Sequence, residues 1–199
     1  VSIVCVLSNY YFPFQSSVDN MYNVKSFIIK NIDFWKLIHF GIADSDPLLR
    51  KYCLYLGKRG VDFAIENNID IHLKLENEDL DFFSYQLEKK SVFENCWKIF
   101  FVIMESLEEK QSHIVSAALD LLPKLDILHP SWLNCVLKRG LVHDNDSIIR
   151  KTLEITLKVT YYASFPYEKL IEALNKIFIY EDFFCFEKIL INPCSARQL

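Results

Sequence analysis

One eight-residue pattern occurs twice in the chain, at positions 100 apart, and it restricts the fold more than any other feature. The copies read Asp44-Ser45-Asp46-Pro47-Leu48-Leu49-Arg50-Lys51 and Asp144-Asn145-Asp146-Ser147-Ile148-Ile149-Arg150-Lys151. In each copy an apolar segment leads into a short turn that contains aspartate, and a segment with two aliphatic residues and an Arg-Lys pair follows. This order is typical of an α-helical hairpin that is used as a repeat.

The spacing between aspartate and arginine predicts how each turn is held. An arginine six residues after the turn aspartate lies one turn into the following helix. Its guanidinium can then donate hydrogen bonds to the aspartate of its own turn or of a stacked neighbour. We therefore predict two corresponding turn pairs, Asp44 with Arg50 and Asp144 with Arg150.

Apolar residues recur with helical spacing through most of the chain. Helices are expected near residues 19–40, 47–60, 92–107, 113–125, 129–140, 147–163, 166–180 and 183–191. Asp46 is expected to cap a helix that Pro47 opens. Periodicity is weak over residues 66–90, where acidic residues cluster, so we interpret this segment as an acidic connecting loop with at most one short helix.

A helical hairpin cannot bury both of its faces alone, so hairpins stack on their neighbours. The sequence therefore predicts an all-α fold, a HEAT/armadillo-like α-solenoid that forms a single helical-repeat region over residues 1–199. The tryptophans Trp35, Trp97 and Trp132 stand among apolar residues at core spacing. We expect them to pack between helices and not to stack on nucleic-acid bases.

The search for catalytic and metal sites returns little. Four glycines among 199 residues leave no phosphate-binding loop, and the six cysteines and five histidines have no zinc-ligand spacing. Glu105, Glu108 and Glu109 could pair as catalytic carboxylates, but a solvated helix end is the favoured interpretation. We expect no catalytic residue, no metal and no cofactor in this chain.

Location and completeness follow from a few further features. Every window long enough to cross a membrane contains charged residues, so no membrane span is expected. Scattered cysteines indicate thiols in a reducing compartment, which favours an intracellular protein of the cytoplasm or nucleus. The chain begins with valine and ends in a polar tail, so we interpret it as a fragment of a longer protein.

Basic residues mark a candidate nucleic-acid surface, although the net charge of −4 gives no general attraction to RNA. Lys51 and Lys58, like Lys151 and Lys158, are seven positions apart and share a helix face. Aligned repeats could turn these cations into a track along a phosphate backbone. The alternative is an ordinary solvated helix face. The candidate RNA-binding residues are Arg50, Lys51, Lys58, Arg59, Lys138, Arg139, Arg150, Lys151 and Lys158.

Two segments carry a resemblance to known families. The turn pattern Asp-x-Asp-Pro-Φ-Φ-Arg-Lys resembles the HEAT-repeat consensus. Residues 97–114, with the Glu-Glu-Lys-Gln-x-His run at 108–113, together with His129-Pro130-Ser131-Trp132 and Arg50-Lys51, resemble the helical N-terminal region of the TAR RNA-binding protein family. Those proteins are large eukaryotic tRNA guanosine 2'-O-methyltransferases of the SpoU class. The resemblance covers most of residues 30–165.

The resemblance implies an armadillo/HEAT-like fold within an enzyme that methylates a tRNA ribose with S-adenosylmethionine. The family's catalytic SpoU domain is C-terminal, and its N-x-G-x-x-x-R, E-G and S-L-N-V type motifs are absent from this sequence. No catalytic or cofactor residue can therefore be carried over. We expect a helical scaffold that holds tRNA or a sister subunit. The alternative is a generic HEAT-like scaffold for protein partners, and an enzyme of another class is disfavoured.

Overall fold

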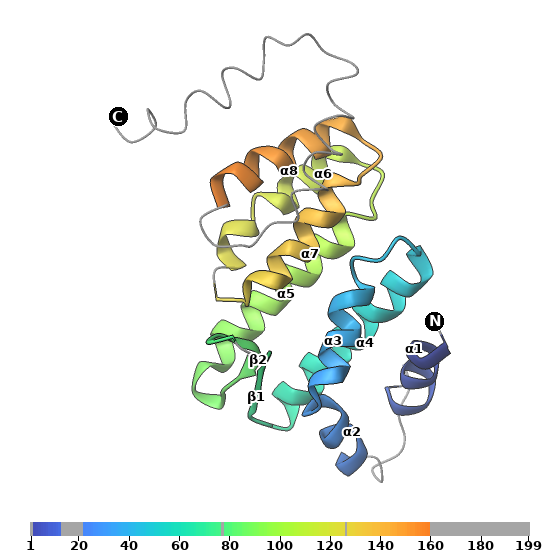
Figure 1. The fold of residues 1–199 in the computed structure, drawn as a ribbon, viewed down its shortest axis with the longest axis vertical. Coiled ribbons are helices and arrows are strands. Elements are labelled where there is room, and N and C mark those ends of the chain that lie inside the picture. The colour runs from blue at the N-terminus through green and yellow to red at the C-terminus, as the bar shows by residue number, and fades with distance from the viewer. Residues whose placement is uncertain (1, 13–21, 77, 126, 160–199) are drawn as a thin grey trace. The chain divides into compact units, whose positions relative to one another are not determined.

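The computed structural model describes residues 2–12, 22–76, 78–125 and 127–159, with side chains in the last helix as far as Thr156 (Figure 1). The chain divides into two units, Val1–Phe165 and Pro166–Leu199, and every described residue belongs to the first. The helices expected at residues 166–180 and 183–191 therefore lie outside the described residues.

The described chain is mostly helical, as its periodicity predicts. The α-helices are α1 (Ser2–Val6), α2 (Tyr22–Ile29), α3 (Ile32–Gly41), α4 (Pro47–Glu66), α5 (Lys90–Ser106), α6 (Ser112–Leu119), α7 (Pro130–Leu141) and α8 (Asp146–Val159). Shorter elements are the π-helical turn η1 (Leu7–Tyr11), the 3₁₀ helices η3 (Leu87–Lys89) and η4 (Leu122–Leu125), and the strands β1 (Ile71–Lys74) and β2 (Asp81–Tyr85).

Six of the helices form three successive hairpins, which are α3 with α4, α5 with α6, and α7 with α8. Their short connections at 42–46, 107–111 and 142–145 make the two helices of each hairpin run antiparallel. The hairpins also contact one another, because α5 packs on α4 and α7, and α6 packs on α8 (Figure 1). Equivalent turns therefore lie at the same end of neighbouring hairpins.

Side-chain caps explain where these helices begin. The Asp46 carboxylate accepts a hydrogen bond from the Leu48 backbone N–H at 2.8 Å, and Pro47 occupies the first position of α4. This confirms the predicted cap. At α8 the Asn145 side chain accepts a bond from the Ser147 N–H at 2.9 Å. Both copies of the repeated pattern thus start a helix with an Asx side chain.

The interpretation of residues 66–90 as an acidic loop is wrong, because this segment contains an antiparallel β-hairpin. Strand β1 pairs with β2 in a register that places Leu73 opposite Phe83. The acidic residues Glu76, Glu78 and Asp79 are exposed between the strands, whereas Phe82, Phe83 and Tyr85 are buried. Aromatic residues favour strands when both faces can be covered. The helices supply that cover here.

The three tryptophans pack in one aromatic core, as predicted, and none is more than 2% exposed. The Trp97 ring lies against those of Trp35, Phe83 and Trp132, with centroid separations of 6.1, 5.2 and 5.0 Å. The indole N–H of Trp132 donates to the Phe82 carbonyl at 2.8 Å. The core therefore joins the β-hairpin to helices α3, α5 and α7.

In the first hairpin and again in the third, a glycine lets the two helices of that hairpin approach each other closely. A Cβ at Gly41 would lie 2.2 Å from Cys53 Sγ, and one at Gly140 would lie 2.3 Å from Thr152 Oγ1. Both pairs join the last turn of the first helix to the second helix of the same hairpin. The two hairpins therefore share a packing device as well as a sequence pattern.

We expect Gly140→Ala to lower the free energy of unfolding by about 2 kcal/mol, because Thr152 is fully buried and cannot move aside. Urea denaturation measures this. The matched control is Gly140→Ala with Thr152→Ala, which removes the two nearest atoms of the clash. The double variant should be more stable than the sum of the single effects predicts. Strict additivity would show that the two residues do not collide.

Candidate nucleic-acid interface

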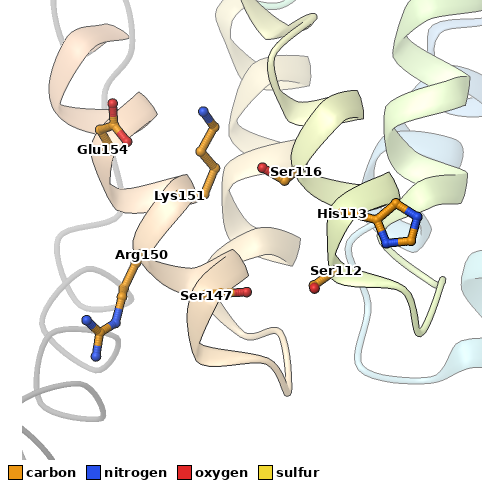
Figure 2. Close-up of a pocket in the computed structure, with 7 residues that line it drawn as sticks. All are labelled: Ser112, His113, Ser116, Ser147, Arg150, Lys151 and Glu154. Atoms are coloured by element: carbon orange, nitrogen blue, oxygen red, sulfur yellow. The ribbon is translucent and has the colours of Figure 1, made fainter.

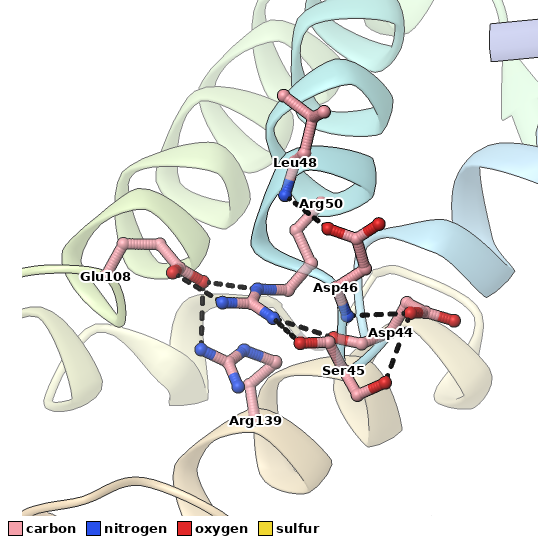
Figure 3. Close-up of polar contacts among 7 residues, drawn as sticks. All are labelled: Asp44, Ser45, Asp46, Leu48, Arg50, Glu108 and Arg139. Carbon is pink, nitrogen blue, oxygen red and sulfur yellow. Dashed lines mark hydrogen bonds and ion pairs between the residues drawn. The ribbon is translucent and has the colours of Figure 1, made fainter. Parts of the chain in front are cut away.

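A single carboxylate, that of Glu108, joins residues from three hairpins (Figure 3). Glu108 lies in the turn between α5 and α6. Arg50 from α4 donates to both of its oxygens, through Nε at 2.7 Å and Nη2 at 2.8 Å. Arg139 from α7 donates to the same carboxylate through Nη2 at 2.9 Å. We call these three residues the turn network.

Arg50 also binds its own turn, through the main chain. Its Nη1 donates to the backbone carbonyls of Asp44 at 2.9 Å and Ser45 at 2.8 Å. The Asp44 carboxylate instead accepts from the Asp46 N–H at 2.8 Å. The carboxylate partner of Arg50 is therefore Glu108 of the neighbouring turn, and not an aspartate as the spacing predicted. Arg50 meets Asp44 only through the main chain.

The second copy of the pattern is arranged differently. The Asn145 N–H donates to His143 Nδ1 at 3.0 Å, and Asn145 in turn accepts from Ser147. Asp144 and Arg150 are both exposed, whereas Arg50 is only 5% exposed. Pairing of Asp144 with Arg150 stays a prediction.

The electrostatics of the turn network follow from burial and the two guanidinium groups. Burial raises the pKa of Glu108, but the hydrogen bonds and positive charges of Arg50 and Arg139 outweigh it and hold the pKa below its ordinary value. Two cations share one anion, so the network keeps an excess positive charge. Glu108 is therefore ionised near neutral pH. The sequence indicated a solvated helix end at Glu105, Glu108 and Glu109 and did not predict that Glu108 binds two arginines.

The structure distributes the nine predicted RNA-binding residues unevenly. Lys58 pairs with Glu105, and Lys151 pairs with Asp120 at 2.6 Å. Arg50 and Arg139 both bind the carboxylate of Glu108. The side chains of Lys51, Lys138 and Arg150 are exposed, Arg59 is partly buried, and the side chain of Lys158 lies outside the described residues. RNA binding by these residues stays a prediction.

A pocket of about 430 Å³ opens between the N-terminal turns of α6 and α8 (Figure 2). Its lining residues are Ser112, His113, Ser116, Ser147, Arg150, Lys151 and Glu154. Figure 2 shows the serine hydroxyls and Lys151 facing the space between the helices, while Arg150 and His113 extend to either side. Sequence reasoning did not identify these serines, although Ser147 lies within the repeated pattern.

The pocket combines groups that suit an anion. The hydrogen bond to Asp120 raises the pKa of Lys151, so its ammonium is charged at neutral pH. The hydroxyls of Ser112 and Ser116 can donate to phosphate oxygens, whereas that of Ser147 donates to Asn145. Lys151 adds a positive charge that Asp120 partly compensates. Glu154 limits the total charge of the pocket. The arrangement could hold a phosphate group but has no nucleophile and base in contact.

Other kinds of site find no support in the part of the chain that the structure describes. There, no three histidine, cysteine or acidic side chains gather as metal ligands. None of the described helices has the length and apolar character to cross a membrane. Burial raises the pKa of the Cys53 thiol to about 11 and that of Cys135 to about 12, so both are protonated and unreactive.

Comparison with known proteins finds a similarity to a tRNA methyltransferase. The chain is 26% identical over 147 residues to the mouse protein named tRNA (guanosine(18)-2'-O)-methyltransferase TARBP1. The alignment covers 67% of this chain but only 9% of the mouse protein. No family model matches the chain. No solved structure matches it either.

Proposed function

We propose that this chain is a helical scaffold in a tRNA 2'-O-methyltransferase-like protein and that it binds or positions tRNA. The similarity to the mouse tRNA methyltransferase carries this proposal. The activity named for that protein would belong to a different part of a longer polypeptide. We also propose a nuclear or cytoplasmic location for it. We expect calorimetry to detect no S-adenosylmethionine binding by this chain.

In this proposal the three hairpins stack as a HEAT/armadillo-like α-solenoid. Two observations support the arrangement. Glu108 in one turn binds arginines from the hairpins before and after it, so neighbouring repeats are tied at equivalent ends. Gly41 and Gly140 allow the same close helix contact in the first and third hairpins. Each hairpin would then present its turn on a common edge.

The turn ends are the proposed RNA surface. Lys51 follows Arg50 and Lys138 precedes Arg139, so both exposed lysines adjoin the turn network. Lys151 and the serine hydroxyls of the pocket lie at the start of α6 and α8. Lysines and hydroxyls of this kind contact phosphates, which fixes the position of an RNA without reading its sequence. We call Lys51, Lys138 and Lys151 the turn lysines.

The test is tRNA binding by fluorescence anisotropy over a range of salt concentrations. We expect Lys51→Glu, Lys138→Glu and Lys151→Glu together to weaken tRNA binding and to flatten the slope of log affinity against log salt by about one unit per lost phosphate contact. The loss should be similar for different tRNAs. Each turn lysine is also reversed singly. The matched control for these single variants is Lys89→Glu, which makes the same charge change at the opposite end of the 17-residue helix α5.

The result also separates RNA binding from the alternative role. Affinity that is indifferent to salt and to reversal of the turn lysines would contradict the proposal and favour a scaffold for protein partners. If Lys89→Glu weakens tRNA binding as much as the reversal of a single turn lysine does, binding depends on the total charge of the protein and not on the position of the turn lysines.

A further inference from the structure

A second surface pocket, of about 440 Å³, lies at the other end of the first hairpin from its turn. It opens between the junction of α2 with α3 and the strand β1. One wall carries Phe27, Lys30 and Asn31, and the other carries His72, Leu73 and Lys74. Its volume falls within the range of about 300–1,000 Å³ that small-molecule sites occupy.

An aromatic residue, Phe27, and two lysines, Lys30 and Lys74, are among the residues that line the pocket. Phe27 is 72% exposed, although burial of a phenyl ring is favourable. Lys30 is exposed, and the ammonium of Lys74 donates to a backbone carbonyl, that of Asp79, at 3.0 Å. No carboxylate is among the lining residues, although Asp81 Oδ2 lies 3.3 Å from Nδ1 of the lining residue His72. The charge of this site is therefore less compensated than that of the pocket between α6 and α8.

We propose that this pocket binds one nucleotide of a single-stranded RNA segment, with its base stacked on Phe27 and its flanking phosphates held by Lys30 and Lys74. The choice of RNA as ligand rests on the proposed function. Proteins that bind single strands combine exposed aromatic rings with a positive groove. Bases in a duplex are stacked on one another and cannot lie on a protein ring, so the site selects unpaired RNA.

The site is separate from the turn lysines. Pocket and turn lie at opposite ends of α3, whose 10 residues span about 15 Å. A variant at one end therefore leaves the other end unchanged, and each surface can be tested alone.

The principal test compares two exposed phenylalanines in the full chain. The probe is a fluorescein-labelled single-stranded RNA of about eight uridines, which covers one such site. We expect Phe27→Ala to weaken its binding about tenfold. The matched control Phe40→Ala removes a ring that is 73% exposed near the far end of α3, and should leave the affinity unchanged. Equal affinity for Phe27→Ala and the unaltered chain would overturn the proposal.

A second variant gives a direct signal of stacking. Phe27→Trp should keep the affinity, and the RNA should quench the fluorescence of this exposed indole, because the three native tryptophans are buried. Lys30→Glu with Lys74→Glu should weaken binding and flatten the salt slope by about one unit per lost phosphate contact. Binding of the RNA without quenching would contradict stacking on residue 27.

Two further probes separate the remaining outcomes. A blunt-ended duplex RNA without a loop should bind Phe27→Ala and the unaltered chain alike. An acidic peptide that binds the pocket and requires Phe27, while the single-stranded RNA does not, would assign the pocket to a protein partner and overturn the proposal. If tRNA binds through the turn lysines and Phe27→Ala changes nothing, this inference fails alone. If no RNA probe binds, the proposed function fails with it.

Discussion

Trp132→Ala is expected to lower the free energy of unfolding by about 4 kcal/mol, the largest effect of any single substitution considered. Trp132 is fully buried at the centre of the aromatic core. Its ring contacts those of His39, Phe82 and Trp97 at centroid separations of 4.9, 5.3 and 5.0 Å. Alanine would leave a cavity in α7 that faces helices α3 and α5 and the strand β2. Urea denaturation measures the loss.

Trp132→Phe divides this effect into packing and hydrogen bonding. Phenylalanine keeps an aromatic ring but cannot donate to the Phe82 carbonyl, which would be left buried without its partner. We expect a loss of about 2 kcal/mol, between the alanine variant and the unaltered chain. The exposed control Val102→Ala should change stability by no more than about 0.5 kcal/mol. If Trp132→Ala were as stable as Val102→Ala, the packing of Trp132 would not contribute to the stability of the fold.

Glu108→Gln is expected to lower the free energy of unfolding by about 2 kcal/mol at neutral pH. The substitution keeps the shape of the side chain but removes the anion shared by Arg50 and Arg139. Arg50 is buried, so its charge would be left with only neutral acceptors, which are the glutamine amide oxygen and the backbone carbonyls. A wholly buried pair would lose more, but the Glu108 side chain is 38% exposed and water screens part of the interaction. The neighbouring exposed residue gives the control Glu109→Gln, which should have little effect.

The effect of Glu108→Gln should depend on pH. Since the pKa of Glu108 is lower in the folded chain than in the unfolded chain, its charge stabilises the fold above about pH 4.3, the ordinary glutamate value. That contribution is lost as the pH falls through the lower, folded-state pKa. The difference between the unaltered chain and Glu108→Gln should therefore be full at pH 7 and shrink below about pH 4. A constant difference from pH 7 to pH 3 would show that the Glu108 charge does not stabilise the fold.

Several features could be read from the sequence because they depend on residues close together in the chain. Helical spacing of apolar residues predicted most of the helices, and Asp46 with Pro47 marked the start of α4. Core spacing also identified the three buried tryptophans. In each case the structure depends on an interaction within about one helical turn, or on a pattern repeated along one helix face.

Other features required the tertiary structure. Arg50 and Arg150 occupy the same place in the repeated pattern, yet one is buried against Glu108 and the other is exposed. Glu108 lies 58 positions from Arg50, and nothing local indicates that helix packing brings them together. The serines of α6 and α8 likewise form a pocket only because two helices lie side by side.

The β-hairpin gives the clearest physical reason. Its acidic residues suggested a loop, but Phe82 packs on Trp132, Phe83 packs on Trp35 and Trp97, and all three tryptophans come from helices. Tyr85 packs on Phe93 of α5. A short strand gains most of its stability from the side chains that cover it, and those come from distant parts of the chain. The sequence by itself therefore determined the helices, the cap of α4 and the buried tryptophans. Only the packing of the hairpins decided where the strands form and which charges meet.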